Sequence, residues 1–324
     1  MTINLCIREV NTRLEKQVKQ RTEKIALQNQ ALEKSKNEIL SSIKYAKRIQ
    51  LAILPSDEQI KDIAPNLFVY YSPKDVVSGD FYFVEQTKTS DTNATGYSII
   101  AAVDCTGHGV PGVFMSIVGN NLFKQSLGEK YVNSPGAALD YLNEGVIKNL
   151  QRKNVDGATI KDGMDIAMCA IKNDFSELVF SGAKNLLYFI RKKSVLCDKP
   201  MPDDVILREE TEALKLFEIK GDRTSIGSDL TVEKDQGYQN HQIDLEVGDK
   251  FFIFSDGYAD QFGGPDGKKF RYKRFRELLL ETYALSPEEE KLALDKVFVE
   301  WRGDTEQIDD VLVMGMRIDD QIKN

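Results

Sequence analysis

The stretch that decides the fold reads DCTGHGVPGVFMSIVGNNLF and covers residues 104–123. An apolar run, YSIIAAV (97–103), leads into Asp104, and a glycine-rich turn and a helix start at Pro111 follow. The turn glycines let the backbone approach a ligand closely, and proline suits the first turn of a helix. This order of elements commonly cradles a phosphate group or a metal ion. The segment is not a Walker A loop, because no GK[ST] follows, and its third glycine is out of register for GxGxxG.

Around this segment, short β-rich runs separated by turn residues predict most of a domain from about residue 66 onward. The predicted strands are 67–71, 80–86, 97–104, 164–172, 177–182, 186–192, 250–256 and 311–318. Helices are predicted at 111–127, 135–152 and 272–301, the last in two parts with a new start at Ser286. We expect surface loops at 198–213 and 228–242. Because strands and helices do not alternate regularly, the pattern favours an α+β fold over a doubly wound parallel sheet.

Four aspartates share one setting, the end of a strongly apolar predicted strand. They are Asp80, Asp104, Asp256 and Asp309. Taken singly, an aspartate at a strand end is usually a turn or cap residue. Gathering several carboxylates is unfavourable unless a cation compensates their charge, and an all-oxygen ligand set suits a hard cation such as Mg²⁺ or Mn²⁺. Four carboxylates would suit a site with two metal ions that activate a water molecule.

The N-terminal segment predicts a long helix, because residues 1–54 contain neither glycine nor proline and are rich in good helix formers. One heptad seam is apolar, with Val18, Ile25, Leu32, Ile39, Ala46 and Ile53. The companion seam is half polar, with Leu14, Arg21, Gln28, Ser35, Ser42 and Ile49. A helix of roughly 75 Å cannot bury such a stripe on a small domain, so we expect a parallel coiled-coil homodimer. The alternative is a solvated leader helix. The expected domains are 1–55 and 56–320.

Composition excludes several classes of function and of metal site. The 324 residues carry a formal net charge of −8, and an acidic body does not suit nucleic acid. The four cysteines form no CxxC pair and there are only two histidines, so a zinc ribbon or a histidine-rich metal site is excluded. The absence of an 18-residue apolar run and of a signal peptide predicts a chain that does not cross a membrane and that resides in the cytoplasm.

The motifs SGDFY, DCTGHGVPG, FSDGYAD and DDVLV, in this order along the chain, resemble the metal-dependent type-2C (PPM) serine/threonine phosphatases. They are most similar to the bacterial SpoIIE/RsbU-type branch, which regulates anti-sigma pathways. The resemblance covers about residues 50–318. Two positions depart from the usual family pattern, since Ser78 replaces a glycine and Phe83 stands where an aspartate is common. Neither change touches the four aspartates.

The resemblance implies two Mn²⁺ or Mg²⁺ ions and a set of residues that would hold them. The set comprises the carboxylates of Asp80, Asp104, Asp256 and Asp309 and the backbone carbonyl of Cys105. Asp104 would bridge the ions, and Asp310 would be a supporting group or a weaker ligand. An activated water would attack a phosphoserine or phosphothreonine directly, without a phosphoenzyme. The implied fold is a β-sandwich of two antiparallel sheets flanked by helices, preceded by the coiled-coil helix.

The resemblance also implies partners. The expected substrate is a phosphorylated regulatory protein, such as a STAS-type antagonist of an anti-sigma factor, and the helix resembles linkers that follow sensor modules. We hypothesise that the dimerising helix gates the assembly of the metal site. The alternatives are a catalytically silent phosphatase-like binding module and a phosphohydrolase for small molecules. Three further roles are weaker possibilities than a structural or solvated role for the same residues. They are proton donation by His108, binding of a third metal ion by Asp162 or Asp165, and contact of Lys74 with a substrate phosphate.

Overall fold

A computed structural model describes residues 2–87, 96–107, 109–126, 133–150, 162–196, 199–227 and 237–319. The chain divides into two compact units, residues 1–48 and 49–324. The first unit belongs entirely to helix α1 (Thr2–Ile53), whose last five residues belong to the second unit. The domain limits expected from the sequence, 1–55 and 56–320, stay a prediction.

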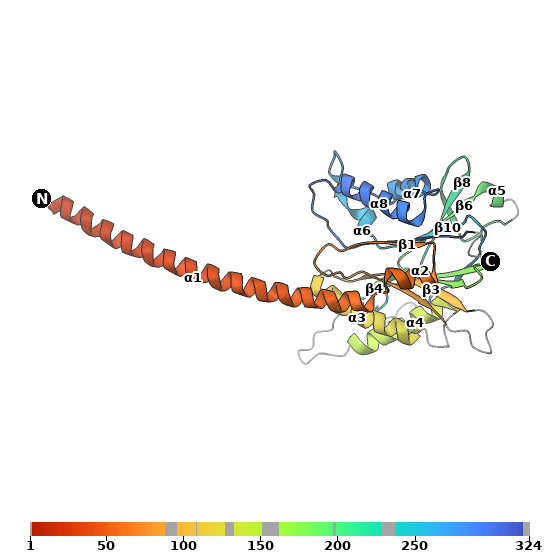
Figure 1. Ribbon diagram of the computed structural model, residues 1–324, viewed down its shortest axis with the longest axis horizontal. Coiled ribbons are helices and arrows are strands. Elements are labelled where there is room, and N and C mark those ends of the chain that lie inside the picture. The colour runs from red at the N-terminus through yellow and green to blue at the C-terminus, as the bar shows by residue number, and fades with distance from the viewer. Residues whose placement is uncertain are drawn as a thin grey trace. The chain divides into compact units, whose positions relative to one another are not determined.

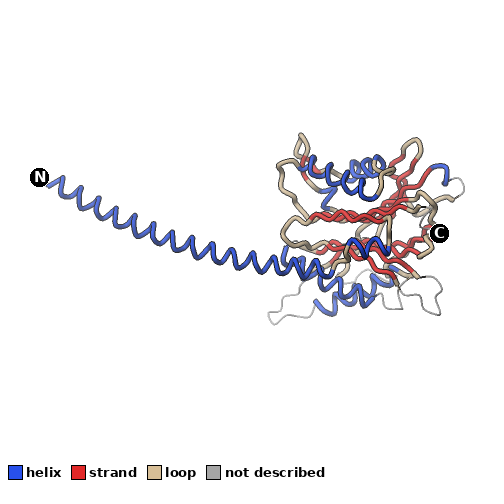
Figure 2. Tube along the Cα trace, viewed as in Figure 1, coloured by secondary structure: helices blue, strands red, loops and turns tan. Residues whose placement is uncertain are grey.

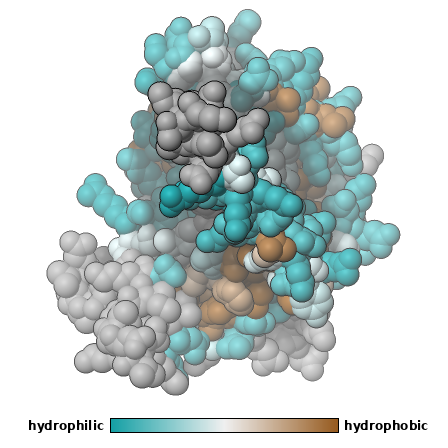
Figure 3. All heavy atoms as spheres, turned by 90° about the vertical axis from the view of Figure 1, so that its left-hand side faces the viewer, coloured by the Kyte–Doolittle hydropathy of each residue, from teal (hydrophilic) through white to brown (hydrophobic). Residues whose placement is uncertain are grey.

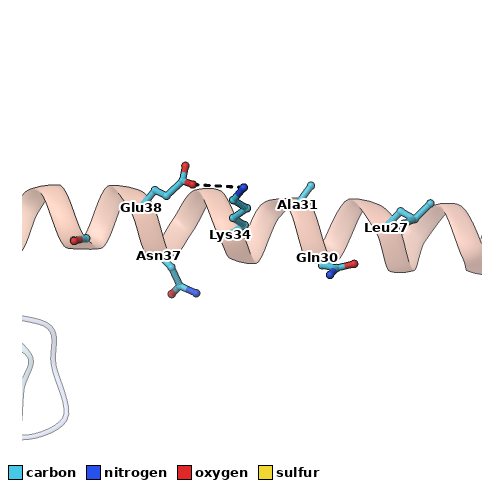
Figure 4. A pocket seen from close by; sticks show the side chains of 7 residues that line it. Leu27, Gln30, Ala31, Lys34, Asn37 and Glu38 are labelled. Atoms are coloured by element: carbon cyan, nitrogen blue, oxygen red, sulfur yellow. Dashed lines mark ion pairs between the residues drawn. The ribbon is translucent and has the colours of Figure 1, made fainter.

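Helix α1 is continuous over 52 residues, as the absence of glycine and proline predicts. Its apolar side chains at positions 18, 25, 32 and 39 are all more than half exposed. Figure 4 shows the stretch from Leu27 to Glu38, where side chains project from the helix and Lys34 lies 4.0 Å from Glu38. The apolar stripe is therefore uncovered within this chain.

The second unit is a sandwich of two antiparallel sheets, which confirms the fold class (Figure 2). The six-stranded sheet runs in the order β1 (Leu67–Ser72), β13 (Val311–Arg317), β10 (Lys250–Phe254), β6 (Leu187–Lys192), β8 (Leu214–Ile219) and β7 (Ile206–Glu210). The five-stranded sheet runs in the order β2 (Phe81–Gln86), β3 (Tyr97–Cys105), β4 (Met164–Lys172), β5 (Glu177–Ala183) and β9 (His241–Asp244). A short hairpin pairs β11 (Phe262–Gly263) with β12 (Lys268–Lys269).

Helices cover both outer faces of the sandwich (Figure 1). Helices α3 (Gly109–Ser126) and α4 (Pro135–Leu150) pack on the five-stranded sheet, and α7 (Tyr272–Glu281) and α8 (Pro287–Arg302) pack on the six-stranded sheet. The shorter helices are α2 (Asp57–Ile63), α5 (Lys193–Leu196) and α6 (Gly257–Asp260). Central strands such as β3 are buried on both faces, because one face meets the other sheet and the other meets helices. This burial explains why they read as continuous apolar runs.

All eight predicted strands and the predicted helices are present, but the loop predicted at 198–213 is partly wrong. Strand β7 lies inside it, on the edge of the six-stranded sheet, and pairs with β8, which was also not predicted. The structure also contains α2 and α6, which were not predicted. In the predicted loop at 228–242, strand β9 begins at His241, whereas 228–236 lie outside the described residues.

The surface of the molecule is mostly hydrophilic on the face shown in Figure 3, with hydrophobic residues in small groups. Among the helices that the structure describes, none combines the length and hydrophobicity needed to cross a bilayer.

Candidate active site

The four candidate aspartates lie on segments that meet at one end of the sandwich. Asp80 directly precedes β2 and Asp104 is the second-last residue of β3, its antiparallel neighbour. Asp256 follows β10 and precedes α6, and Asp309 lies just before β13, the antiparallel neighbour of β10. Each sheet thus contributes two aspartates from the same end of two adjacent strands.

The charges of these carboxylates act on one another. Burial, followed by the charge of Asp104, raises the pKa of Asp80 well above its usual value. Burial, followed by the charges of Asp256 and Asp309, raises the pKa of Asp104 well above its usual value. Burial and then Asp309 raise the pKa of Asp256 to about 6. Without a cation, the protein therefore resists full ionisation of the group.

Asp80 is the most deeply buried of the four, and its Oδ2 atom has no hydrogen-bond partner. A buried carboxylate oxygen without a partner, surrounded by other carboxylates, is unfavourable unless a cation binds there. The all-oxygen donor set fits Mg²⁺ or Mn²⁺. Among the described residues, however, no three side chains of His, Cys, Asp or Glu lie close enough together to coordinate a metal ion as they stand.

The turn after β3 brings its backbone against the loop that carries Asp80. A Cβ atom added to Gly79 would lie 2.4 Å from the carbonyl oxygen of Gly107 and 3.2 Å from that of Cys105. Only glycine fits at position 79, because any side chain would collide with backbone. The Cys105 thiol is buried, and burial raises its pKa well above the usual value. The carbonyl of Cys105, rather than its thiol, faces this junction.

Asp309 and Asp310 play different parts. Asp309 is exposed, and its Oδ1 atom accepts a hydrogen bond of 2.8 Å from the backbone amide of Asp310. Asp310 is buried, and its two oxygens accept hydrogen bonds of 2.8 Å from the backbone amides of Lys74 and Gly79. Its carboxylate thus holds the loop before Asp80 in place.

Two of the residues with weaker predicted roles in the site, Asp165 and Lys74, have defined contacts in the structure. Asp165 lies opposite Asp104 in the β3–β4 pair, and its carboxylate is 3.4 Å from the ammonium group of Lys184. Lys74 contributes its backbone amide to the hydrogen bond with Asp310. His108 lies outside the described residues.

Gln50, which the sequence reasoning did not single out, also contacts the Asp80 loop. Its side chain is buried, and its Nε2 atom donates hydrogen bonds to the carbonyl of Ser78 at 2.6 Å and to the hydroxyl of Ser116 at 3.2 Å. Its Oε1 atom accepts a hydrogen bond from the Ser78 amide at 3.2 Å. The end of α1 is therefore joined to the residue two positions before Asp80. A glutamine on a helix gives no sequence signal for such a contact.

Comparison with known proteins assigns this arrangement to a family. The sequence model of the family described as Stage II sporulation protein E (SpoIIE) matches residues 94–319. The chain belongs to the SpoIIE family. The matched region includes Asp104, Asp256 and Asp309, whereas Asp80 precedes its first residue. As a member of this family the chain is a PPM-type serine/threonine phosphatase, which confirms the predicted resemblance and enzyme class.

Solved structures agree with the SpoIIE assignment. The SiaA-PP2C domain of Pseudomonas aeruginosa is 29% identical, with a TM-score of 0.69 over 88% of this chain and 99% of that chain. A structure of the PP2C phosphatase domain and a regulatory-domain fragment of Bacillus subtilis SpoIIE shares the fold at 17% identity, with a TM-score of 0.52 over 78% of this chain and 63% of that one. The RsbU and RsbW domains of Rv1364c from Mycobacterium tuberculosis share it at 16% identity, with a TM-score of 0.50 over 78% and 59%. No curated protein matches by sequence.

Proposed function

We propose that this SpoIIE-family phosphatase removes phosphate from serine or threonine on a regulatory partner protein, using two Mn²⁺ or Mg²⁺ ions. The observation that carries the proposal is the convergence of aspartates from both sheets, each raising the pKa of the next. Such mutual repulsion is relieved when divalent cations bind among the carboxylates.

The proposed ligands are the carboxylates of Asp80, Asp104, Asp256 and Asp309 and the backbone carbonyl of Cys105. Bound divalent ions would lower the pKa of water and neutralise charge on the phosphoryl group. As the family resemblance implies, Asp104 would help to hold both ions. The charges of Asp256 and Asp309 from the other sheet act on its carboxylate. Asp310 would position Asp80 through the amide of Gly79 rather than bind an ion itself.

The proposed substrate is a phosphoserine protein of the STAS type that antagonises an anti-sigma factor. Support comes from the SpoIIE family match and from the likeness to the solved RsbU and RsbW domains of Rv1364c. The acidic composition, with a net charge of −8, gives no support to a nucleic-acid substrate.

We further propose that the N-terminal helix forms a parallel homodimer and gates the site. The uncovered stripe at 18, 25, 32 and 39 supports the dimer, because a partner helix would bury it. The hydrogen bonds between Gln50 and Ser78 support gating. A shift of residues 49–53 would move the backbone next to Gly79, whose amide and neighbour Asp80 belong to the proposed site. A sensor module, on the same chain or on another, would supply the shift.

The test is hydrolysis of p-nitrophenyl phosphate and of a phosphoserine protein with Mn²⁺, with Mg²⁺ and with a chelator. Asp104→Asn removes one carboxylate charge with almost no change of shape, and Asp203→Asn makes the same change at an exposed loop position. We expect turnover that needs metal, falls at least a hundredfold in Asp104→Asn and is retained in Asp203→Asn. Metal binding without turnover of either substrate would indicate a gated enzyme that awaits its partner, whereas the absence of both turnover and metal binding would favour the silent binding module.

A further inference from the structure

A strongly basic segment lies in this otherwise acidic protein. KKFRYKRFR, residues 268–276, holds six cationic and no acidic side chains, in a chain whose net charge is −8. It spans β12, the connection to α7 and the first half of α7. Five of the six cations are exposed, and these five form the group called here the basic rim: Lys268, Lys269, Arg271, Lys273 and Arg274.

The basic rim is fixed beside the candidate active site. Lys269 forms an ion pair of 2.8 Å with Asp260, the last residue of α6. The amide of Arg271 donates a hydrogen bond of 2.6 Å to the carbonyl of Ala259, also in α6. Helix α6 has only four residues and begins directly after Asp256. The rim therefore lies within one helical turn of a proposed metal ligand.

Arg271 has a backbone conformation that glycine normally adopts. Its φ is 72° and its ψ is 149°. This conformation is unfavourable for a residue with a Cβ atom, and such strain concentrates at functional sites. The side chain is exposed, and no described carboxylate lies within ion-pair distance of its guanidinium group. A strained backbone thus presents an unpaired cation to solvent.

The rim also encloses a hollow of about 350 Å³. Arg274 forms one wall, with its guanidinium 4.2 Å from the centre of the Trp301 ring, so its orientation is fixed by stacking. Among the described residues, Lys268 and Lys273 pair with exposed carboxylates, Asp266 at 3.3 Å and Glu277 at 3.9 Å. Exposed pairs of this kind contribute little free energy, so another anion can replace either partner.

We propose that the basic rim binds acidic side chains that flank the phosphorylated residue of the protein substrate. The inference rests on the proposed function, because it requires a polypeptide whose phosphorylated residue enters the site. An extended peptide advances about 3.3 Å per residue, so its carboxylates a few positions from the phosphorylated residue can reach the rim. Arg271 and Arg274 supply the planar donor groups that pair best with carboxylates.

Two synthetic phosphoserine peptides test the inference with the full chain. One carries glutamates on both sides of the phosphoserine, and the other carries glutamines at the same positions. We expect kcat/KM to be about tenfold higher for the acidic peptide in low salt, and the preference to shrink in 0.5 M NaCl. Lys268→Glu with Lys273→Glu should reduce the preference to about one. The matched control, Lys291→Glu with Lys296→Glu, makes the same charge change on α8 and should keep it.

A second variant separates charge from folding. Arg271→Gly removes the cation and relieves the backbone strain, so its melting temperature should not fall while its preference for the acidic peptide does. Arg271→Lys should restore most of the preference. Equal hydrolysis of both peptides by the unmodified chain overturns the inference and leaves the proposed function standing. Hydrolysis of p-nitrophenyl phosphate but of neither peptide contradicts both.

Discussion

The carboxylate of Asp310 accepts a hydrogen bond of 2.8 Å from the backbone amide of Gly79, 231 positions away in the sequence. This bond connects the start of β13 to the residue before Asp80, so the two sheets are joined where the aspartates meet. The second oxygen of Asp310 accepts a hydrogen bond from the Lys74 amide, which fixes the other end of the same loop. Asp310 is buried, and both bonds are therefore shielded from water.

Asp309→Asn and Asp310→Asn should differ, although the residues are adjacent. An asparagine at 310 can accept one amide hydrogen bond but presents an NH₂ group to the other, which should lower the free energy of unfolding by about 1–3 kcal/mol. At position 309 the side chain is exposed, so stability should be retained while the metal concentration for half-maximal activity rises. Urea denaturation with chelator and activity titration with Mn²⁺ measure the two effects. Equal loss of stability in both variants would contradict the division of roles.

Stability without metal should decrease as pH rises. Burial and neighbouring carboxylates raise the folded-state pKa of Asp80 and Asp104, and that of Asp256 to about 6. A carboxyl group whose pKa is raised by folding contributes to the free energy of unfolding. This contribution is complete below the unfolded-state pKa, about 4, and is lost as pH rises through the folded-state pKa. Bound Mg²⁺ compensates the ionised carboxylates, so it should raise the melting temperature more at pH 8 than at pH 5. Asp256→Asn should reduce this difference, and an equal increase at both pH values would refute the explanation.

A buried ion pair at the opposite end of β10 from Asp256 should be important for stability. Arg191 donates to both carboxylate oxygens of Asp249, with Nε at 2.9 Å from Oδ1, and both side chains are buried. Asp249→Asn would leave the guanidinium charge uncompensated and should cost about 3–5 kcal/mol in unfolding free energy. Asp244→Asn is the control, because only the backbone carbonyl of this exposed residue accepts from Arg191. Urea denaturation should show a change below about 0.5 kcal/mol for the control.

The proposed coiled-coil dimer predicts a difference between apolar residues of α1 that lie close together in the sequence. Ile25 and Leu32 lie on the apolar seam, whereas Leu27 lies two positions beyond Ile25 on an outer face of the heptad. Ile25→Glu with Leu32→Glu should therefore give monomers in sedimentation experiments, and Leu27→Glu should remain dimeric. Deleting residues 1–40 should remove the dimer and change phosphatase activity. If the deletion changes neither, both the dimer and the gating proposal fail.

The fold was largely predictable because its central strands are apolar on both faces. Strand β7, ILREE, was missed because it is a mostly exposed edge strand, so burial leaves no pattern in its sequence. Helix α2 could have been found. Its N-cap Ser56 and Gln59 form a capping box, which is visible in the sequence as SDEQ before a short apolar pattern.

The candidate site was predictable in part for a different reason. Aspartates at the ends of apolar strands are visible as sequence, and the motifs identify them. The contacts of Asp310 and Gln50 are hydrogen bonds to backbone groups of Lys74, Ser78 and Gly79, which every residue except proline can offer through its amide. The resemblance implied a supporting role for Asp310, but contacts to main-chain atoms over long sequence separations leave no compositional trace. The folded structure supplies the partners of both residues.

Helix α1 continues without a break from residue 2 to residue 53 and ends in the segment that holds Gln50. A rigid helix conveys rotation about its axis, and each added residue turns everything beyond it by about 100°. Inserting two residues between positions 30 and 40 would therefore rotate the side chains before the insertion almost to the opposite side of the helix axis. Inserting seven residues would restore their original direction to within about 20°. If phosphatase activity follows this angular period rather than the number of residues added, the helix transmits its signal by rotation about its axis.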